Sequence, residues 1–173
     1  DKLNSIGLKP ISALVDITNY ILFDFNRPLH VYDADKVYGN IIIRSAKKDE
    51  KFLGLDDKEY TLDKDMCVIA DEKKPLGLGG ILGGSSSACD MSTTNIFLES
   101  ALFIPSNIAN TGRKLFIDSD ARYRFERGVD PNSLNIGLDK ATSLIQEICG
   151  GEISETQTCG TAIKGEQDIS FDL

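Results

Sequence analysis

The chain has 173 residues, 41% of them hydrophobic, which is enough to bury a core as one domain and excludes an intrinsically disordered tail. Its apolar runs are only strand-length, far below the roughly 20 residues of a membrane span, and residues 1–10 do not resemble a signal peptide. The formal net charge of −8 is opposite to that of a typical free-standing nucleic-acid-binding domain.

The first clear element is an amphipathic helix predicted over residues 12–25. Its apolar residues recur at steps of three and four, the spacing of one helix face. They are Leu14, Ile17, Ile21, Leu22 and Phe25. Pro28 follows shortly afterwards and bars continuation of the helix, because proline lacks the backbone N–H and its ring clashes with the preceding turn.

The middle of the chain is predicted to form strands. Strand-like runs lie at residues 40–46, 59–62, 66–72 and 94–103. The tripeptide "LDD" at 55–57 is typical of a turn between the first two runs.

Two helices are predicted in the last third of the chain. A short one follows Pro105 through Lys114, and a longer one has Asp130 at the cap position and Pro131 at the first helical position. One face of the longer helix is apolar, and it consists of Leu134, Leu138, Ala141, Ile145 and Ile148. "GG" at 150–151 ends this helix.

Beyond it, residues 152–158 alternate in polarity, which favours a strand, and "DISFDL" at 168–173 favours a further one. Because strands and helices do not alternate regularly, we predict an α+β fold in which layered, sandwich-like sheets pack with helices as three ββα layers. Residues 1–173 are expected to be a single domain. Since the first residues resemble a helix tail and the last a fresh strand, we expect a fragment of a larger chain.

The four cysteines, at positions 67, 89, 149 and 159, show no CxxC spacing. Their expected state is therefore reduced and mostly buried, as in a cytosolic protein. His30 is the single histidine, which argues against a histidine-based metal cluster.

The glycine-rich stretch "PLGLGGILGGSSS" at 75–87 allows three interpretations. A phosphate loop is disfavoured, because Ser85 stands where a P-loop has lysine, Leu82 breaks the GxGxxG pattern, and "SSSACDMSTT" opens a helix poorly. A loop of tight turns is the second interpretation. The third is a pocket wall of bare backbone, where side chains would obstruct a ligand.

Four segments carry a family resemblance: "VDITNYILFDFNRPLHVYD" (15–33), "GLGGILGG" (77–84), "IFLESALF" (96–103) and "SDARYRFERGVDP" (119–131). In this order and spacing they closely resemble the editing domain of the bacterial-type phenylalanyl-tRNA synthetase beta subunit, over nearly the whole chain. The resemblance implies hydrolysis of Tyr-tRNA(Phe) made in error, whereas aminoacylation in that family belongs to the alpha subunit.

The resemblance also implies roles for individual residues. Glu99 corresponds to the glutamate that meets the tyrosine hydroxyl, and Ser119 stands where the family commonly has threonine. His30 and Asn19 are the catalytic candidates, either of which could orient the hydrolytic water, although the terminal hydroxyl of the tRNA could assist instead. The predicted substrate-binding residues are Glu99, Thr18, Gly80, Gly83, Ser119 and Ala121.

Each of these assignments has a structural alternative. Glu99 could point to solvent, His30 could anchor the turn after the helix, and Asn19 could be a surface amide. The cluster of Arg122, Arg124 and Arg127 with Glu126 is interpreted first as an ion-pair network and only second as a tRNA contact.

The chemistry fits a hydroxyl-reading site. Tyrosine and phenylalanine differ by one hydroxyl, so a second site that demands this group can select chemically where size cannot. Phenylalanine would leave a buried carboxylate unpaired, at a cost of about 1–3 kcal/mol or more. Bare glycine backbone would leave room for the aromatic ring.

The resemblance implies no metal or cofactor in this domain, with ATP and magnesium serving the whole synthetase. The implied partners are the tRNA(Phe) acceptor end, the tyrosine moiety of the mischarged tRNA, the alpha subunit and the rest of the beta chain, in the cytoplasm and without a membrane. The alternative function is a non-catalytic RNA- or protein-interaction module with the same fold.

Overall fold

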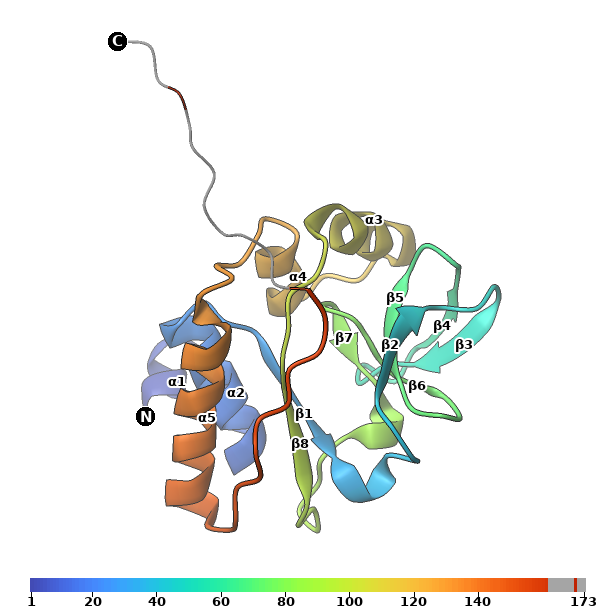
Figure 1. Cartoon of the computed structure of the whole chain (residues 1–173). Helices are drawn as coiled ribbons and strands as arrows, with labels where there is room; N and C mark the ends of the chain where they lie inside the picture. The colour runs from blue at the N-terminus through green and yellow to red at the C-terminus, as the bar shows by residue number, and fades with distance from the viewer. Residues whose placement is uncertain (162–169, 171–173) are drawn as a thin grey trace.

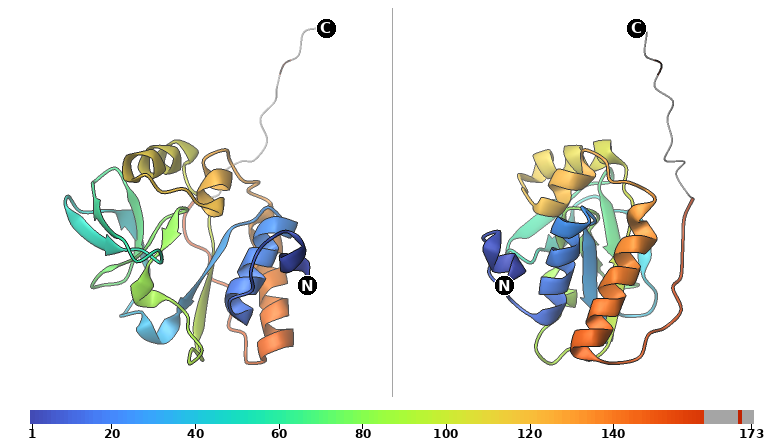
Figure 2. Two further views of the ribbon diagram at one scale, coloured as in Figure 1. Left: turned by 180° about the vertical axis from the view of Figure 1, so that it is seen from behind. Right: turned by 90° about the vertical axis from the view of Figure 1, so that its left-hand side faces the viewer.

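The computed structural model describes residues 1–161 and 170, and it shows three layers (Figure 1). Helices form one outer layer, a two-stranded ribbon lies in the middle, and small antiparallel sheets form the other outer layer. The view from behind shows the same order, and the view from the side looks onto the helical layer with the strands behind it (Figure 2). The α+β prediction of sheets packed with helices is confirmed.

The helical layer consists of α1 (Lys2–Ser5), α2 (Ala13–Asp24) and α5 (Ser133–Cys149). α2 begins where the sequence predicts, because the Ser12 hydroxyl accepts a hydrogen bond from the Val15 N–H. α2 packs against α5 and β1 through the apolar face predicted above, which includes Ile17 and Ile21.

The middle ribbon pairs β1 (Leu29–Asp33) with β8 (Ile96–Ser100) in antiparallel register. His30 lies directly opposite Glu99 in this ladder. Alternate residues of a strand project to the same face, so the ribbon presents one face to the helices and one to the sheets. The run predicted at 94–103 is thus a strand only in its central five residues.

The main sheet has the strand order β2-β5-β6-β7, formed by β2 (Ile42–Ser45), β5 (Cys67–Ala70), β6 (Pro75–Leu78) and β7 (Leu82–Gly83). A hairpin of β3 (Glu50–Leu53) and β4 (Glu59–Leu62) packs beside it. The 3-10 turns Ala34–Lys36 and Ser85–Ser87 complete this layer.

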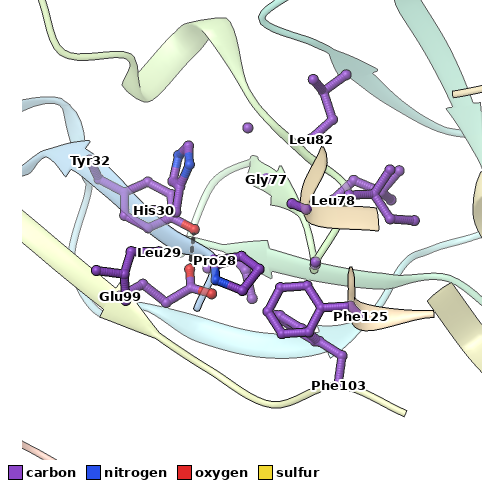
Figure 3. Close-up of a pocket in the computed structure, with 16 residues that line it drawn as sticks. Pro28, Leu29, His30, Tyr32, Gly77, Leu78, Leu82, Glu99, Phe103 and Phe125 are labelled. Carbon is purple, nitrogen blue, oxygen red and sulfur yellow. Dashed lines mark hydrogen bonds between the residues drawn. The ribbon is translucent and has the colours of Figure 1, made fainter. Parts of the chain in front are cut away.

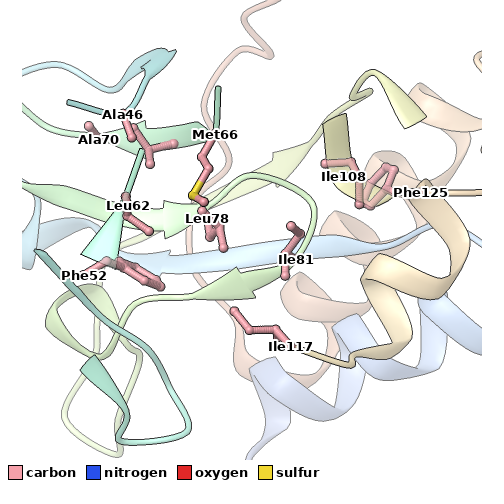
Figure 4. Packing of buried hydrophobic residues seen from close by; sticks show 11 residues of the cluster. Ala46, Phe52, Leu62, Met66, Ala70, Leu78, Ile81, Ile108, Ile117 and Phe125 are labelled. Atoms are coloured by element: carbon pink, nitrogen blue, oxygen red, sulfur yellow. The ribbon is translucent and has the colours of Figure 1, made fainter. Parts of the chain in front are cut away.

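The largest apolar cluster lies between these strands and the helices α3 (Pro105–Leu115) and α4 (Asp120–Phe125), as Figure 4 shows. Phe52 and Leu78 enter it from the strands, and Ile108 and Phe125 enter it from the two helices. This cluster fixes α4 against the glycine-rich strands, and that placement builds one wall of the site described below.

Several predicted boundaries need correction. The last helix starts at Ser133 rather than Pro131, because the Asp130 carboxylate accepts from the Asn132 N–H and holds a turn there. Residues 152–158 form no strand, since no neighbouring strand pairs with them. No element was predicted for the glycine stretch, which forms strands β6 and β7. None was predicted for residues 120–125 either, which form the helix α4. The strand predicted at 168–173 falls outside the described residues, apart from position 170.

Within the described part of the chain all four cysteines are free thiols, but only Cys67 and Cys89 are partly buried. Cys149 and Cys159 are exposed, which corrects the expectation of mostly buried thiols. Cys149 ends α5 and Cys159 lies in the irregular segment after it. Neither position has core packed around it.

Candidate functional site

A cavity of about 80 Å³ lies between the ribbon, the β6–β7 hairpin and α4 (Figure 3). β1 contributes His30 and Tyr32 to its wall, and β8 contributes Glu99. The remaining wall is glycine backbone and apolar side chains, among them Phe103 and Phe125. Polar groups are therefore few and gathered on the ribbon side.

Glu99 and Tyr32 point toward one another in this cavity (Figure 3). The Tyr32 hydroxyl donates a hydrogen bond of 2.5 Å to Oε2 of Glu99, while Oε1 has no hydrogen-bond partner among the described residues. Burial raises the pKa of the Glu99 carboxyl, and the hydrogen bond from Tyr32 partly opposes this. Burial, followed by the charge of Glu99, raises the pKa of Tyr32. The tyrosine therefore stays a neutral donor.

His30 stands beside this pair. Its ring centroid lies 4.4 Å from that of Tyr32 at an interplanar angle of 72°, an edge-to-face arrangement. Burial lowers the pKa of His30 to about 4, so the imidazole is neutral at pH 7. Its ring nitrogens have no hydrogen-bond partner in the described chain, so one neutral donor and one neutral acceptor remain available.

Two glycines of the glycine-rich stretch allow aromatic side chains of the protein to pack directly on the backbone. A Cβ on Gly83 would lie 2.9 Å from Nε2 of His30 and closer still to Cε1. A Cβ on Gly80 would lie 2.8 Å from the Phe103 ring, and the φ of +68° at Gly80 also disfavours a side chain. Gly77 differs, because its nearest neighbour, the Tyr32 hydroxyl oxygen, would lie at an ordinary 3.5 Å.

The same hairpin engages several backbone N–H groups of the glycine stretch. The N–H groups of Gly79, Ile81 and Gly84 donate to the carbonyls of Cys67, Leu78 and Leu76. The segment continues into a three-residue 3-10 turn and not into an α-helix. These three amides are engaged within the fold, which argues against a phosphate loop. The stretch makes the tight turn of the β6–β7 hairpin at Gly80 and also lines the cavity.

Five of the predicted site residues line the cavity: His30, Glu99, Gly80, Gly83 and Ala121. Glu99 thus does not simply point to solvent. Ser119 lies just behind the wall, where its hydroxyl donates to the Ile81 carbonyl at 2.7 Å and accepts from the Arg122 N–H as the N-cap of α4. Its observed contacts position the helix that carries Ala121.

Thr18 and Asn19 lie on α2, which packs against β1, and neither is among the residues that line the cavity. The Thr18 hydroxyl donates to the carbonyl of Val15 within the helix, at 2.9 Å. Their roles in binding and catalysis stay predictions.

Sequence reasoning missed Tyr32 and Phe103. The short β1 strand was not predicted, although "HVYD" places His30 and Tyr32 two residues apart and so on the same strand face. That spacing was the available signal for Tyr32. Phe103 follows β8, and only the tertiary fold brings it over Gly79 and Gly80.

The arginine cluster forms the predicted ion-pair network. Nε of Arg122 lies 3.0 Å from Glu126, and Nη1 of Arg127 lies 2.8 Å from the same carboxylate. Arg124 pairs with Asp120 at 3.0 Å.

Within the described residues, no three His, Cys, Asp or Glu side chains are arranged to hold a metal ion, and no helix is long and apolar enough to cross a membrane.

The B3/4 domain family matches residues 1–150. The chain is 53% identical over 172 residues to the phenylalanine–tRNA ligase beta subunit of Nitrobacter winogradskyi and 52% identical to that of Mesorhizobium japonicum. Each alignment covers 99% of this chain and 21% of the relative, so the chain spans about a fifth of the length of these curated relatives.

A solved N-terminal fragment of the phenylalanyl-tRNA synthetase beta subunit from Pyrococcus horikoshii is 21% identical, with a TM-score of 0.42. That match covers 49% of this chain and 32% of the fragment.

Proposed function

This chain belongs to the B3/4 domain family, and we propose that it is the editing domain of a phenylalanyl-tRNA synthetase beta subunit, which hydrolyses Tyr-tRNA(Phe). The observation that carries the proposal is the Glu99 carboxylate, which lies in an aromatic-lined cavity and already accepts a phenol hydroxyl, that of Tyr32. A wall that accepts one phenol has the chemistry to accept another.

Selectivity would come from the second oxygen of Glu99. Because Tyr32 occupies Oε2, a ligand hydroxyl can donate to Oε1 while Tyr32 holds the carboxylate in position. Phenylalanine would leave this acceptor desolvated and unpaired, a penalty of about 1–3 kcal/mol that is greater for a charged group. Each 1.4 kcal/mol is roughly tenfold in affinity, so one carboxylate supplies about ten- to hundredfold discrimination.

Space for the ligand ring requires a local movement. The cavity holds about 80 Å³, less than the roughly 150 Å³ of an apolar cavity that accepts benzene. The Phe103 ring, which lies over Gly79 and Gly80, is partly exposed, and we expect it to move aside. The glycine backbone beneath it would then face the ligand.

Hydrolysis would depend mainly on positioning, because an aminoacyl ester is already activated toward water. The neutral His30 imidazole can accept a hydrogen bond from that water beside Glu99. Asn19 would be a second water-orienting group, acting from α2 outside the cavity lining. The tRNA acceptor end, the alpha subunit and the rest of the beta chain complete the proposed assembly.

The test is deacylation of Tyr-tRNA(Phe) and Phe-tRNA(Phe) by the intact synthetase that contains this chain. We expect the parent to clear Tyr-tRNA(Phe) preferentially, and Glu99→Ala to lower this preference about tenfold or more while aminoacylation is unchanged. Glu147→Ala, an exposed carboxylate on α5, is the matched control. A parent enzyme that clears neither substrate would favour the non-catalytic interaction module.

A further inference from the structure

A second recess, of about 320 Å³, lies on the surface between α3 and α4. Ala109 and Arg113 line it from α3, and Arg122, Glu126 and Arg127 line it from α4 and the turn that follows. Three guanidinium groups and one carboxylate give this recess a local charge of about +2 in a chain whose formal net charge is −8. Its charge is thus opposite to that of the chain as a whole.

The recess and the Glu99 cavity share α4. Ala121 and Phe125, four residues apart, line the cavity, whereas Arg122 and Glu126, also four apart, line the recess. A helix with its side chains is about 10–12 Å across. The two hollows therefore lie on different faces of one short helix.

Arg122 is held in place at the back of the recess. Its Nη1 donates to the Ile117 carbonyl at 2.5 Å, and its Nε donates to Glu126 at 3.0 Å. The guanidinium packs on Gly112 of α3, where any Cβ would collide with it. Only 16% of the Arg122 side chain is exposed, so its orientation costs little further entropy on binding.

Arg113 and Arg127 form the exposed rim. Arg113 donates through Nε to the Ala109 carbonyl, and Arg127 donates through Nη1 to Glu126 and the Tyr123 carbonyl. Nη1 of Arg113, Nη2 of Arg122 and Nη2 of Arg127 have no acceptor among the described residues. Glu126 therefore holds Arg122 and Arg127 without using all of their donors.

We propose that this recess binds a backbone phosphate of the nucleic-acid strand whose terminal aminoacyl ester occupies the Glu99 cavity. This inference rests on the proposed function. Planar guanidinium groups recognise phosphate oxygens through paired N–H donors, and unlike the glycine stretch the recess has donors to spare. The thickness of α4 corresponds to about three or four stacked nucleotides at roughly 3.4 Å each, so the phosphate belongs to the strand close to the ester.

The test uses Arg113→Gln, Arg127→Gln and the double variant in the intact synthetase. Lys114→Gln is the matched control, because Lys114 follows Arg113 on α3 but pairs with Asp63 and Asp65 outside the recess. Deacylation of Tyr-tRNA(Phe) is measured over a salt series, next to hydrolysis of a small tyrosine ester that carries no phosphate.

We expect the double variant to raise KM for Tyr-tRNA(Phe) about tenfold and to lower the slope of log KM against log salt by about 0.7 for each phosphate that the arginines no longer neutralise. Lys114→Gln should change KM less than about twofold, and the small ester should be hydrolysed at the parental rate by all variants. An unchanged KM in the double variant, an equal effect of Lys114→Gln, or an equally slowed hydrolysis of the small ester would each overturn the phosphate site. A parent synthetase that does not deacylate Tyr-tRNA(Phe) would instead refute the proposed function, and the phosphate site with it.

Discussion

Gly83 and Gly77 lie opposite one another in the β6–β7 hairpin, and the structure predicts different outcomes when each becomes alanine. At Gly83 the new methyl would lie 2.9 Å from Nε2 of His30, closer still to Cε1, and 2.8 Å from the Leu55 side chain. The imidazole would have to shift by about 1 Å to regain ordinary contact. Its edge-to-face packing on Tyr32, at 4.4 Å, resists that movement.

The expected cost follows from this collision. Overpacking of this kind lowers the free energy of unfolding by about 1–3 kcal/mol, and a displacement of roughly 1 Å in a group that orients a reactant can slow a reaction about 100-fold. Gly77→Ala adds the same methyl at an ordinary 3.5 Å from the Tyr32 hydroxyl oxygen. It should be neutral or stabilise by up to about 1 kcal/mol, because alanine restricts the unfolded chain.

Urea unfolding of the two variants and of the parent chain measures the stability difference, and deacylation of Tyr-tRNA(Phe) by the corresponding synthetases measures the rate. Gly83→Ala should unfold at lower urea than Gly77→Ala and should deacylate about 100-fold more slowly. Equal midpoints, or a parental rate for Gly83→Ala, would show that Gly83 does not make room for the His30 ring.

Two further predictions concern the polar groups of the cavity. Tyr32→Phe removes the hydrogen bond that holds the Glu99 carboxylate, so the preference for Tyr-tRNA(Phe) over Phe-tRNA(Phe) should fall severalfold in competition assays; an unchanged ratio would exclude a positioning role for Tyr32. His30, the only histidine, should titrate by NMR with a pKa of about 4 rather than 6.5, because burial lowers the pKa. Between these values the unfolded chain binds more protons, so this residue's contribution to stability is present above pH 6.5 and is lost as the pH falls toward 4. A midpoint near 6.5 in the folded chain would show that the imidazole is solvated.

The three longest helices and several strands could be predicted because their determinants are local. The apolar spacing of residues 12–25 is contained within a few turns, and α2 begins within one residue of the predicted start. The strand at 59–62 has the predicted bounds for the same reason, since its alternating residues pack as one side of a hairpin. Residues 152–158 show the limit of this reasoning, because alternation alone supplies no partner strand.

Local patterns were enough to predict the α+β class, and the family resemblance indicated the site residues, of which Glu99, His30 and the glycines line one cavity. Two contacts become visible only in the folded chain: Tyr32 donates a hydrogen bond to Glu99, 67 residues away, and Arg113 of α3 lines the same recess as Arg122 of α4. These contacts depend on the register between β1 and β8 and on the packing of α4 against the core. A periodic pattern predicts which face of a helix or strand is buried. Which other element packs against that face depends on how the whole chain buries its apolar surface.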